Sequence, residues 1–284
     1  MINKRKIGFY ANGAFQSLPI ENTCDILLRI GYDAVELDRW WIERSRERLS
    51  DEVRSIERSG LSLSEVVLQL DYIDLDPDAR ECSIRQTEDY ILRCSAAGAT
   101  TFNLFTGPRP WIAGRITVGE DISMTDAWSM LFEAFDRLVP LAEGSGAMLA
   151  VENVWGMLCH DFFTMEHLVN HYASPNLGVN FDPSHDQLAG NCDMEFLLRQ
   201  WGRDRIKHVH LKDAAGSQKR GRVLFPPLGE GLVDWAGFAR GLDAIGYDGV
   251  LSVEYEADAH LSRRLGGDWI KAAEESYSAL HGLL

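Results

Sequence analysis

The sequence predicts a single-domain (β/α)8 barrel over residues 1–284, and three observations support that prediction. Eight short runs rich in Val, Ile, Leu and Phe alternate with amphipathic segments, the order that gives parallel strands joined by helices. A chain of 284 residues, 45% of them hydrophobic, has the size of one closed barrel. No change of composition along the chain marks a boundary between two domains.

The expected strands are short and apolar enough to be buried on both faces. They cover residues 7–10, 34–38, 61–70, 101–105, 148–153, 177–182, 206–213 and 249–255. Most of the amphipathic segments between them end at a glycine, a residue that often terminates a helix. These expected helices cover residues 21–30, 50–58, 85–97, 124–143, 165–171, 194–199, 235–245 and 269–280.

The main alternative fold is an open, doubly wound sheet. That fold usually has a glycine-rich dinucleotide loop after the first strand, whereas here Ala11-Asn12-Gly13-Ala14 follows it. Two long irregular segments, 106–121 and 214–231, both follow strands. In a barrel they would lie at the catalytic face, where long loops are usually functional.

Composition limits the kinds of partner. The formal net charge is -15 and the pI is near 4.9, so the surface repels nucleic acid and anionic membranes. No segment approaches the roughly 20 apolar residues that span a bilayer. The start of the chain lacks the apolar region of a signal peptide, and the five widely spaced cysteines include no CxxC pair. We therefore expect a cytoplasmic protein with reduced thiols.

Acidic and imidazole side chains fall at the ends of the last four expected strands. Glu152 ends the fifth, Asp182 the sixth, His208-Val209-His210 the seventh and Glu254 the eighth. In a barrel these ends converge on one mouth. Carboxylate and imidazole ligands together suit Mn²⁺, Mg²⁺, Co²⁺ or Zn²⁺, and a cation would relieve the repulsion between the acids.

Each residue has a simpler interpretation when taken alone. Glu152 could cap a helix, and Asp182, followed by Pro183, could belong to a turn. His208 and His210 have the same strand parity, so one of them could be a core histidine. Glu36 could line the mouth or pair with Arg39. The combination over four strands favours a metal site.

These motifs resemble the xylose isomerase-like TIM barrels. The resemblance covers essentially the whole chain and is sharpest from residue 148 to 256, where HVHLKD and the GYDG…VE ending occur. The superfamily includes ketose 3-epimerases, hydroxypyruvate isomerase, inosose dehydratase, dehydroshikimate dehydratases and apurinic endonucleases of the endonuclease IV type. The resemblance implies one divalent metal ion, with Mn²⁺ as first choice, and a homo-oligomer, dimer or tetramer.

The resemblance also implies roles for individual residues. Glu152, Asp182, His210 and Glu254 match the family's metal ligands, and which of His208 and His210 is the ligand stays open. Glu152 and Glu254 match its catalytic acid and base. The remaining predictions are substrate-binding residues, namely His185, His208, Lys212, Trp155 and Trp111.

Departures from the family patterns narrow the function. The extra histidines of the three-zinc endonucleases are missing, which agrees with the acidic charge in excluding DNA repair. Ketose 3-epimerases carry a Glu where this chain has Leu158 and an Arg where it has Gly216. Lys212, Arg220 or Arg222 could replace that arginine.

The expected chemistry is proton transfer beside a metal-polarised carbonyl, through an enediolate. The first hypothesis is an isomerase or epimerase of a small ketose or keto-sugar. The alternative is a dehydratase, a lyase, of an inosose or dehydroshikimate-like substrate. A third hypothesis, from a different class, is a non-catalytic barrel within a hetero-oligomer.

Overall fold

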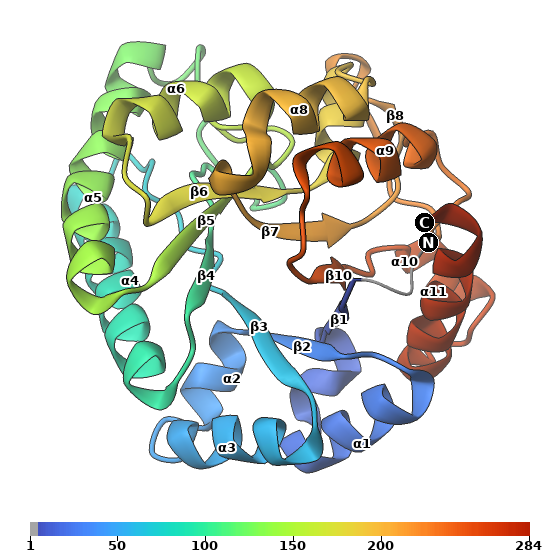
Figure 1. The fold of residues 1–284 in the computed structure, drawn as a ribbon. Coiled ribbons are helices and arrows are strands. Elements are labelled where there is room, and N and C mark those ends of the chain that lie inside the picture. Colours follow the sequence, from blue (N-terminus) through green and yellow to red (C-terminus); the bar gives the residue numbers. More distant parts are fainter. Residues whose placement is uncertain (1–4) are drawn as a thin grey trace.

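A computed structural model describes residues 5–284 as one closed barrel of parallel strands, so the predicted fold class is confirmed (Figure 1). Its strands are β1 Ile7–Tyr10, β2 Ala34–Asp38, β3 Ser62–Val67, β4 Thr101–Leu104, β5 Met148–Glu152, β6 Leu177–Phe181, β7 Ile206–Leu211 and β10 Leu251–Val253. Their order around the barrel is β1-β10-β7-β6-β5-β4-β3-β2. Pairing of β1 with β10 closes the barrel, with Ile7 opposite Leu251.

The helices form a ring outside the strands, as Figure 1 shows. They are α1 Ile20–Ile30, α2 Arg39–Arg44, α3 Leu49–Ser59, α4 Pro77–Ala97, α5 Met124–Ser145, α6 Phe162–Tyr172, α7 Pro183–Ala189, α8 Met194–Arg205, α9 Trp235–Ile245, α10 Asp258–Arg263 and α11 Trp269–Leu283. Every predicted helix has a counterpart. α4 begins earlier than predicted because Asp76 caps its first turn and Pro77 suits its first position. None of the described helices is long and apolar enough to cross a bilayer.

The sequence patterns missed several short elements near the barrel mouth. These are the 3-10 helix η2 Gly13–Ser17, the helices α2, α7 and α10, and the hairpin of β8 Ala215–Ser217 and β9 Arg222–Leu224 with the 3-10 turn η3 Gln218–Arg220. Each is too short to show a helical or strand period. The hairpin lies within the predicted long loop 214–231, where Asp213 accepts hydrogen bonds from the backbone amides of Gly229, Gly231 and Val233. That carboxylate therefore holds the base of the loop beside β7.

The barrel has an apolar outer layer and a polar interior near its mouth. Phe9 packs against Tyr32, which in turn packs against Tyr277 of α11, between the strands and the helices. Pairing registers shift at Val35/Glu36 and at Val179/Asn180. Bulges of this kind commonly redirect side chains next to functional sites, and here Glu36 and Asn180 both point into the polar interior.

The backbone of Gly178 in β6 lies close to the backbone of Arg205, and this contact allows the packing to be tested. A Cβ added there would lie 2.2 Å from the carbonyl oxygen of Arg205. We expect Gly178→Ala to destabilise the fold by at least about 1–3 kcal/mol through overpacking. That corresponds to a melting temperature roughly 3–10 °C lower, measured by circular dichroism.

The matched control is Gly144→Ala in α5, where an added Cβ meets nothing within 4 Å. Alanine is the better helix former by about 1 kcal/mol, so this variant should melt at the same or a higher temperature. Equal melting temperatures for the two variants would contradict the close approach at β6.

Candidate metal centre and active-site pocket

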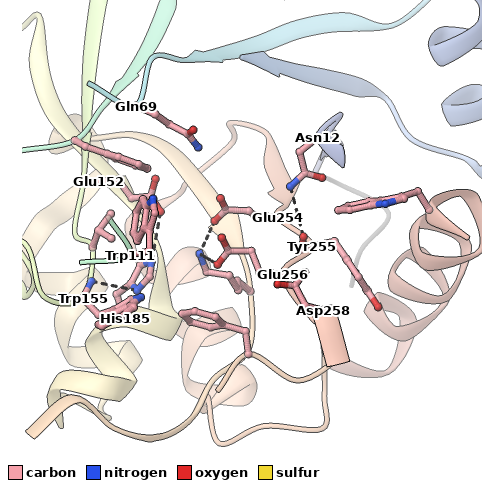
Figure 2. Close-up of a pocket in the computed structure, with 15 residues that line it drawn as sticks. Asn12, Gln69, Trp111, Glu152, Trp155, His185, Glu254, Tyr255, Glu256 and Asp258 are labelled. Atoms are coloured by element: carbon pink, nitrogen blue, oxygen red, sulfur yellow. Dashed lines mark hydrogen bonds and ion pairs between the residues drawn. The ribbon is translucent and has the colours of Figure 1, made fainter. Parts of the chain in front are cut away.

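A cavity of about 390 Å³ opens at the carboxyl ends of the strands. Its lining residues are Asn12, Gln69, Phe105, Trp111, Glu152, Val154, Trp155, His185, Lys212, Phe225, Glu254, Tyr255, Glu256, Asp258 and Trp269. Figure 2 shows Trp155 and His185 on one side, Tyr255 and Asp258 on the other, and Glu254 between them. The volume is in the range of small-molecule sites.

The four residues predicted as metal ligands come together at this cavity, where Glu152 and Glu254 belong to the lining. Glu152, Asp182, His210 and Glu254 each offer one ligand atom, and these atoms all lie within 4.8 Å of one another. Nδ1 of His210 lies 3.4 Å from Oε1 of Glu152 and 3.2 Å from Oε2 of Glu254. All four residues are buried. Their role as ligands remains a prediction, but three carboxylates and one imidazole fit a hard or borderline divalent cation.

The two carboxylate oxygens of Asp182 make different contacts. Its Oδ1 accepts a hydrogen bond from the backbone N–H of Ser184 at 2.8 Å and so caps α7. Its Oδ2 is buried and makes no hydrogen bond within the described residues, although Nζ of Lys212 and Nε2 of His185 lie near it. The turn interpretation and the ligand interpretation of this residue are therefore compatible.

Charge interactions at the cavity perturb ionisation strongly. Burial alone would raise the pKa of Glu152, but the nearby His210 and His185 hold that pKa well below its usual range. Burial would lower the pKa of His210, but Glu36, Glu152 and Glu254 raise it well above its usual value. Several buried carboxylates therefore interact with only a few positively charged groups.

Lys212 is the cation that lies closest to these acids in the cavity lining. Its Nζ lies 2.5 Å from Oε2 of Glu254, 3.0 Å from Oδ2 of Asp182 and 3.1 Å from Oε2 of Glu256. Burial would lower the pKa of Lys212, but these carboxylates raise it well above its usual value. A charged ammonium therefore contacts two of the four predicted ligands.

Most of the predicted substrate-binding residues line the cavity. His185 places Nε2 3.3 Å from Oδ2 of Asp182 and accepts from the backbone N–H of Trp155 at its Nδ1, 3.3 Å away. Trp111 packs edge-on against Phe105, with ring centroids 6.0 Å apart. Both tryptophans, His185 and Lys212 border the same space.

His208 is placed differently from the other predicted substrate-binding residues. It is buried and is not among the residues that line the cavity. Its ring lies 5.7 Å from that of His210 and its Nε2 lies 3.0 Å from Oε2 of Glu36. His210 is the histidine that faces Glu152 and Glu254, whereas His208 faces Glu36, and a role of His208 in substrate binding stays a prediction.

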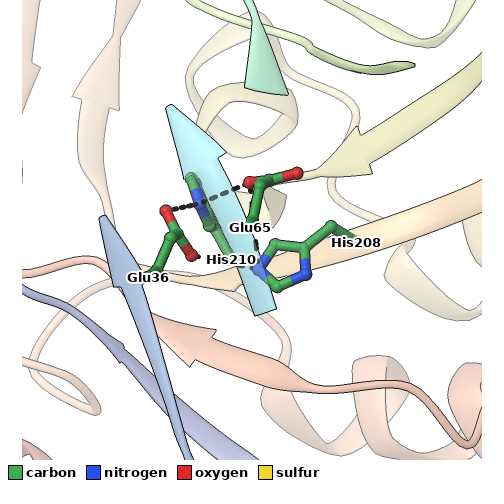
Figure 3. Close-up of side chains that lie close together, drawn as sticks. All are labelled: Glu36, Glu65, His208 and His210. Atoms are coloured by element: carbon green, nitrogen blue, oxygen red, sulfur yellow. Dashed lines mark hydrogen bonds and ion pairs between the residues drawn. The ribbon is translucent and has the colours of Figure 1, made fainter. Parts of the chain in front are cut away.

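A second cluster was not predicted from the sequence. Glu36, Glu65, His208 and His210 also place ligand-type atoms within 4.8 Å of one another (Figure 3). Glu36 contacts the two histidines, and Arg39 instead lies over the ring of Trp40. Burial raises the pKa of Glu36, but His210 and His208 outweigh it and lower that pKa to about 2. The only indication in the sequence was one acidic residue, Glu36 or Glu65, within each of two strands expected to be buried.

Gln69 and Glu256 also line the cavity without having been predicted. Glu256 follows Glu254 at the same strand parity, a signal the sequence did offer. The sequence offers no such signal for Gln69. This residue is distinguished instead by its backbone conformation, with a φ of 51° in the left-handed region. Strain of this kind clusters at functional sites.

Taken together, the geometry defines a (β/α)8 barrel with an acid-and-histidine centre at its mouth. The sequence profile of the family described as xylose isomerase-like TIM barrel matches residues 24–280, and the chain belongs to this family.

Two curated relatives show how distant the similarity is. An uncharacterized protein of Methanocaldococcus jannaschii, MJ1311, is 26% identical over 226 residues, which cover 74% of this chain and 72% of that protein. An inosose dehydratase of Geobacillus thermodenitrificans is 25% identical over 146 residues, 47% of this chain. The chain matches only 48% of the length of that dehydratase.

Solved structures share the fold along almost the whole chain. The IolI protein with a bound zinc atom has a TM-score of 0.75 at 18% identity, covering 98% of this chain and 97% of that one. The 3-keto-D-glucoside 4-epimerase YcjR of E. coli has a TM-score of 0.74 at 17% identity, covering 99% of both chains. At these identities the likeness establishes the fold alone.

The strain at Gln69 gives a test of whether this residue serves the cavity. A left-handed conformation costs a non-glycine residue about 1–2 kcal/mol, and glycine's own entropic cost is roughly 0.5–1 kcal/mol. We therefore expect Gln69→Gly to leave the melting temperature unchanged or raise it by about 1–3 °C. If the amide contacts substrate, the same variant should lower kcat/KM about tenfold or more, in line with the loss of one buried hydrogen-bonding group. A variant that melts clearly lower, with unchanged kcat/KM, would contradict both expectations.

Proposed function

We propose that the protein is a metal-dependent isomerase or epimerase of a small ketose or keto-sugar. The observation that carries this proposal is the convergence of Glu152, Asp182, His210 and Glu254 at an open cavity. A divalent cation held there, with Mn²⁺ as first choice, would polarise a substrate carbonyl and ease removal of the neighbouring proton. The IolI structure, which has the same fold and a bound zinc atom, supports a divalent metal in this chain.

Glu152 and Glu254 are proposed to transfer the proton. Their carboxylates approach His210 from β5 and from the end of β10, so they reach the cavity from different parts of the barrel. His210 and His185 lower the pKa of Glu152 and so keep this carboxylate ionised, the form that accepts a proton. Glu254 lies beside the Lys212 ammonium and Glu256. Return of the proton to the opposite face gives epimerisation, and return to the adjacent carbon gives isomerisation.

The walls of the cavity are consistent with a sugar-like substrate. Trp111, Trp155, Phe225 and Trp269 supply aromatic surfaces on which the apolar faces of sugars can pack. Asn12, Gln69 and Asp258 supply hydrogen-bonding groups for hydroxyls. The proposal retains a cytoplasmic enzyme and a homodimer or homotetramer as predictions.

A dehydratase of an inosose or dehydroshikimate-like substrate is the second candidate. Two observations favour it: the relatives named inosose dehydratase, and the Lys212 ammonium 2.5 Å from Glu254. The neighbouring acids raise the pKa of Lys212 in the metal-free protein, but a cation bound by Asp182 and Glu254 would offset them. The ammonium could then give a proton to a departing hydroxyl while a carboxylate takes the carbon-bound proton. Both candidates share the first step, removal of a proton beside a carbonyl.

The two candidates are distinguished by proton NMR in D₂O. The protein loaded with Mn²⁺, and separately with Zn²⁺, is incubated with ketoses, a 3-keto-glucoside and an inosose. We expect deuterium at the carbon next to the carbonyl with the carbon skeleton and hydroxyls retained, and loss of this activity after treatment with a chelator. Loss of water from the substrate, seen as a mass decrease of about 18 Da, would instead establish the dehydratase. Metal-loaded protein that catalyses neither exchange nor water loss on any compound would contradict the proposed chemistry.

Replacement of Lys212 tests the acid role that the second candidate requires. On any compound that loses water, we expect Lys212→Met to slow water loss about 10²- to 10⁴-fold, because a general acid is removed. Deuterium exchange next to the carbonyl should fall much less. Lys207→Met in β7, the strand that Lys212 directly follows, is the matched control, since Lys207 does not line the cavity. An equal fall in both rates would show that Lys212 contributes charge balance and not proton donation.

A further inference from the structure

The cluster of Glu36, Glu65, His208 and His210 lies beside the proposed metal centre and shares one residue with it. Figure 3 shows Glu36 and Glu65, from the neighbouring strands β2 and β3, facing the two histidines of β7. The four residues are at most 2% exposed, so water does not compete for their polar atoms. Contacts inside this cluster, together with the amide nitrogen of Asn180 3.1 Å from Nε2 of His210, therefore decide how His210 is oriented.

His210 presents its two ring nitrogens to two different groups of acids. Nδ1 faces the proposed metal centre, 3.4 Å from Oε1 of Glu152 and 3.2 Å from Oε2 of Glu254. Nε2 faces the second cluster and lies 3.0 Å from Oε1 of Glu36. A metal-binding histidine typically donates its other N–H to a carboxylate, which fixes the tautomer and the orientation of the ring.

We infer that Glu36 is a positioning residue that accepts the Nε2 proton of His210 and thereby presents the Nδ1 lone pair to the cation. The inference rests on the proposed metal centre, which supplies the cation. An ionised carboxylate can only accept hydrogen bonds, so the Nε2 atom that faces it carries the proton. In a neutral imidazole the other nitrogen is then the acceptor, which is the form that binds a metal.

Glu36 is itself held in place by the second histidine. Its Oε2 lies 3.0 Å from Nε2 of His208, so each oxygen of one carboxylate accepts from a different ring. The register shift between Val35 and Glu36 in β2 accompanies this inward placement. His208 therefore acts through Glu36 and not through the substrate, which accounts for its position outside the cavity lining.

Glu65 also lies close to His210, but it does not accept a hydrogen bond from Nε2 of that histidine. Its Oε2 lies 3.7 Å from Nε2 of His210, beyond hydrogen-bond distance, and instead accepts from Nδ2 of Asn180 at 3.3 Å. Its Oε1 makes no hydrogen bond within residues 5–284. Glu65 is thus a natural control for effects that depend only on charge near His210.

A second cation held by the same four residues is the rival interpretation. It would require Nε2 of His210 to lose its proton and bind that cation while Nδ1 binds the first one. The 3.0 Å separations between Glu36 and each histidine are the ordinary length of a hydrogen bond, so protons alone suffice to hold these contacts. The number of cations bound per chain separates the two interpretations.

The experiment compares wild type with Glu36→Met, Glu36→Gln and Glu65→Gln. Dissociation constants for Zn²⁺ and Mn²⁺ are measured by competition with a chelating dye, and metal content by elemental analysis. We expect Glu36→Met to weaken cation binding about 10- to 100-fold, the usual effect of losing such a partner. Glu36→Gln keeps one acceptor oxygen for two histidines and should weaken binding less. Glu65→Gln should change it less than about threefold.

Long-range ¹H–¹⁵N NMR of the histidine rings supplies a readout that a purely structural role would not change. In the metal-free wild type, at a pH high enough to leave the His210 ring neutral, the ring should carry its proton on Nε2, and in Glu36→Met it should show a mixture of tautomers. Circular dichroism melting verifies that each variant is folded, and Glu36→Gln serves if Glu36→Met does not fold.

Three results would overturn the inference. One is equal cation affinity in wild type and the Glu36 variants, and another is an equal loss in Glu65→Gln. The third is two bound cations per chain in wild type that fall to one in Glu36→Met. Failure of wild type to bind any divalent cation would overturn the proposed function as well, whereas the first three results leave it intact.

Discussion

The arrangement of side chains at the mouth of this barrel depends on the free-energy cost of burying negative charge. Glu36, Glu65, Glu152, Asp182 and Glu254 are all at most 6% exposed. Two carboxylates about 4 Å apart repel each other by roughly 4 kcal/mol at the effective dielectric of a protein. Lys212 and the histidines offset part of this repulsion. The remainder is the physical reason for proposing a cation, since a divalent ion placed among these oxygens removes the repulsion directly.

The fold supplies the rigidity that such a centre needs. Neighbouring strands carry Glu152, Asp182 and His210, so the hydrogen-bonded barrel sets their separations. Asn153 then ties the strand ends together, because its amide donates to the carbonyl of Asp182 and to Oδ2 of Asp186, each at 3.0 Å. Buried acids repel one another, so a rigid framework such as the hydrogen-bonded barrel is needed to hold them close together. If the strands relaxed, the acids would move apart.

Much of this arrangement was predictable from the sequence because it depends on local patterns. Alternating apolar and amphipathic runs gave the barrel, and the positions of Glu152, Asp182 and Glu254 at strand ends gave their convergence. The roles of Glu36 and Glu65 were not predictable, because their contacts cross the barrel interior to His208 and His210. His208 illustrates the same limit: strand parity pointed it inward, but parity did not show that its partner would be Glu36 of β2.

The two departures from the ketose 3-epimerase pattern have structural consequences for substrate recognition. Leu158, which stands where those enzymes carry a Glu, is buried in the hydrophobic core and does not line the cavity. Gly216 stands where they carry an Arg. It has a φ of 108°, and an added Cβ would lie 2.2 Å from the carbonyl oxygen of Arg222, so the hairpin excludes any side chain there. Polar recognition of a substrate must therefore come from other groups that border the cavity, and Gln69, Lys212 and Glu256 are positioned to provide it.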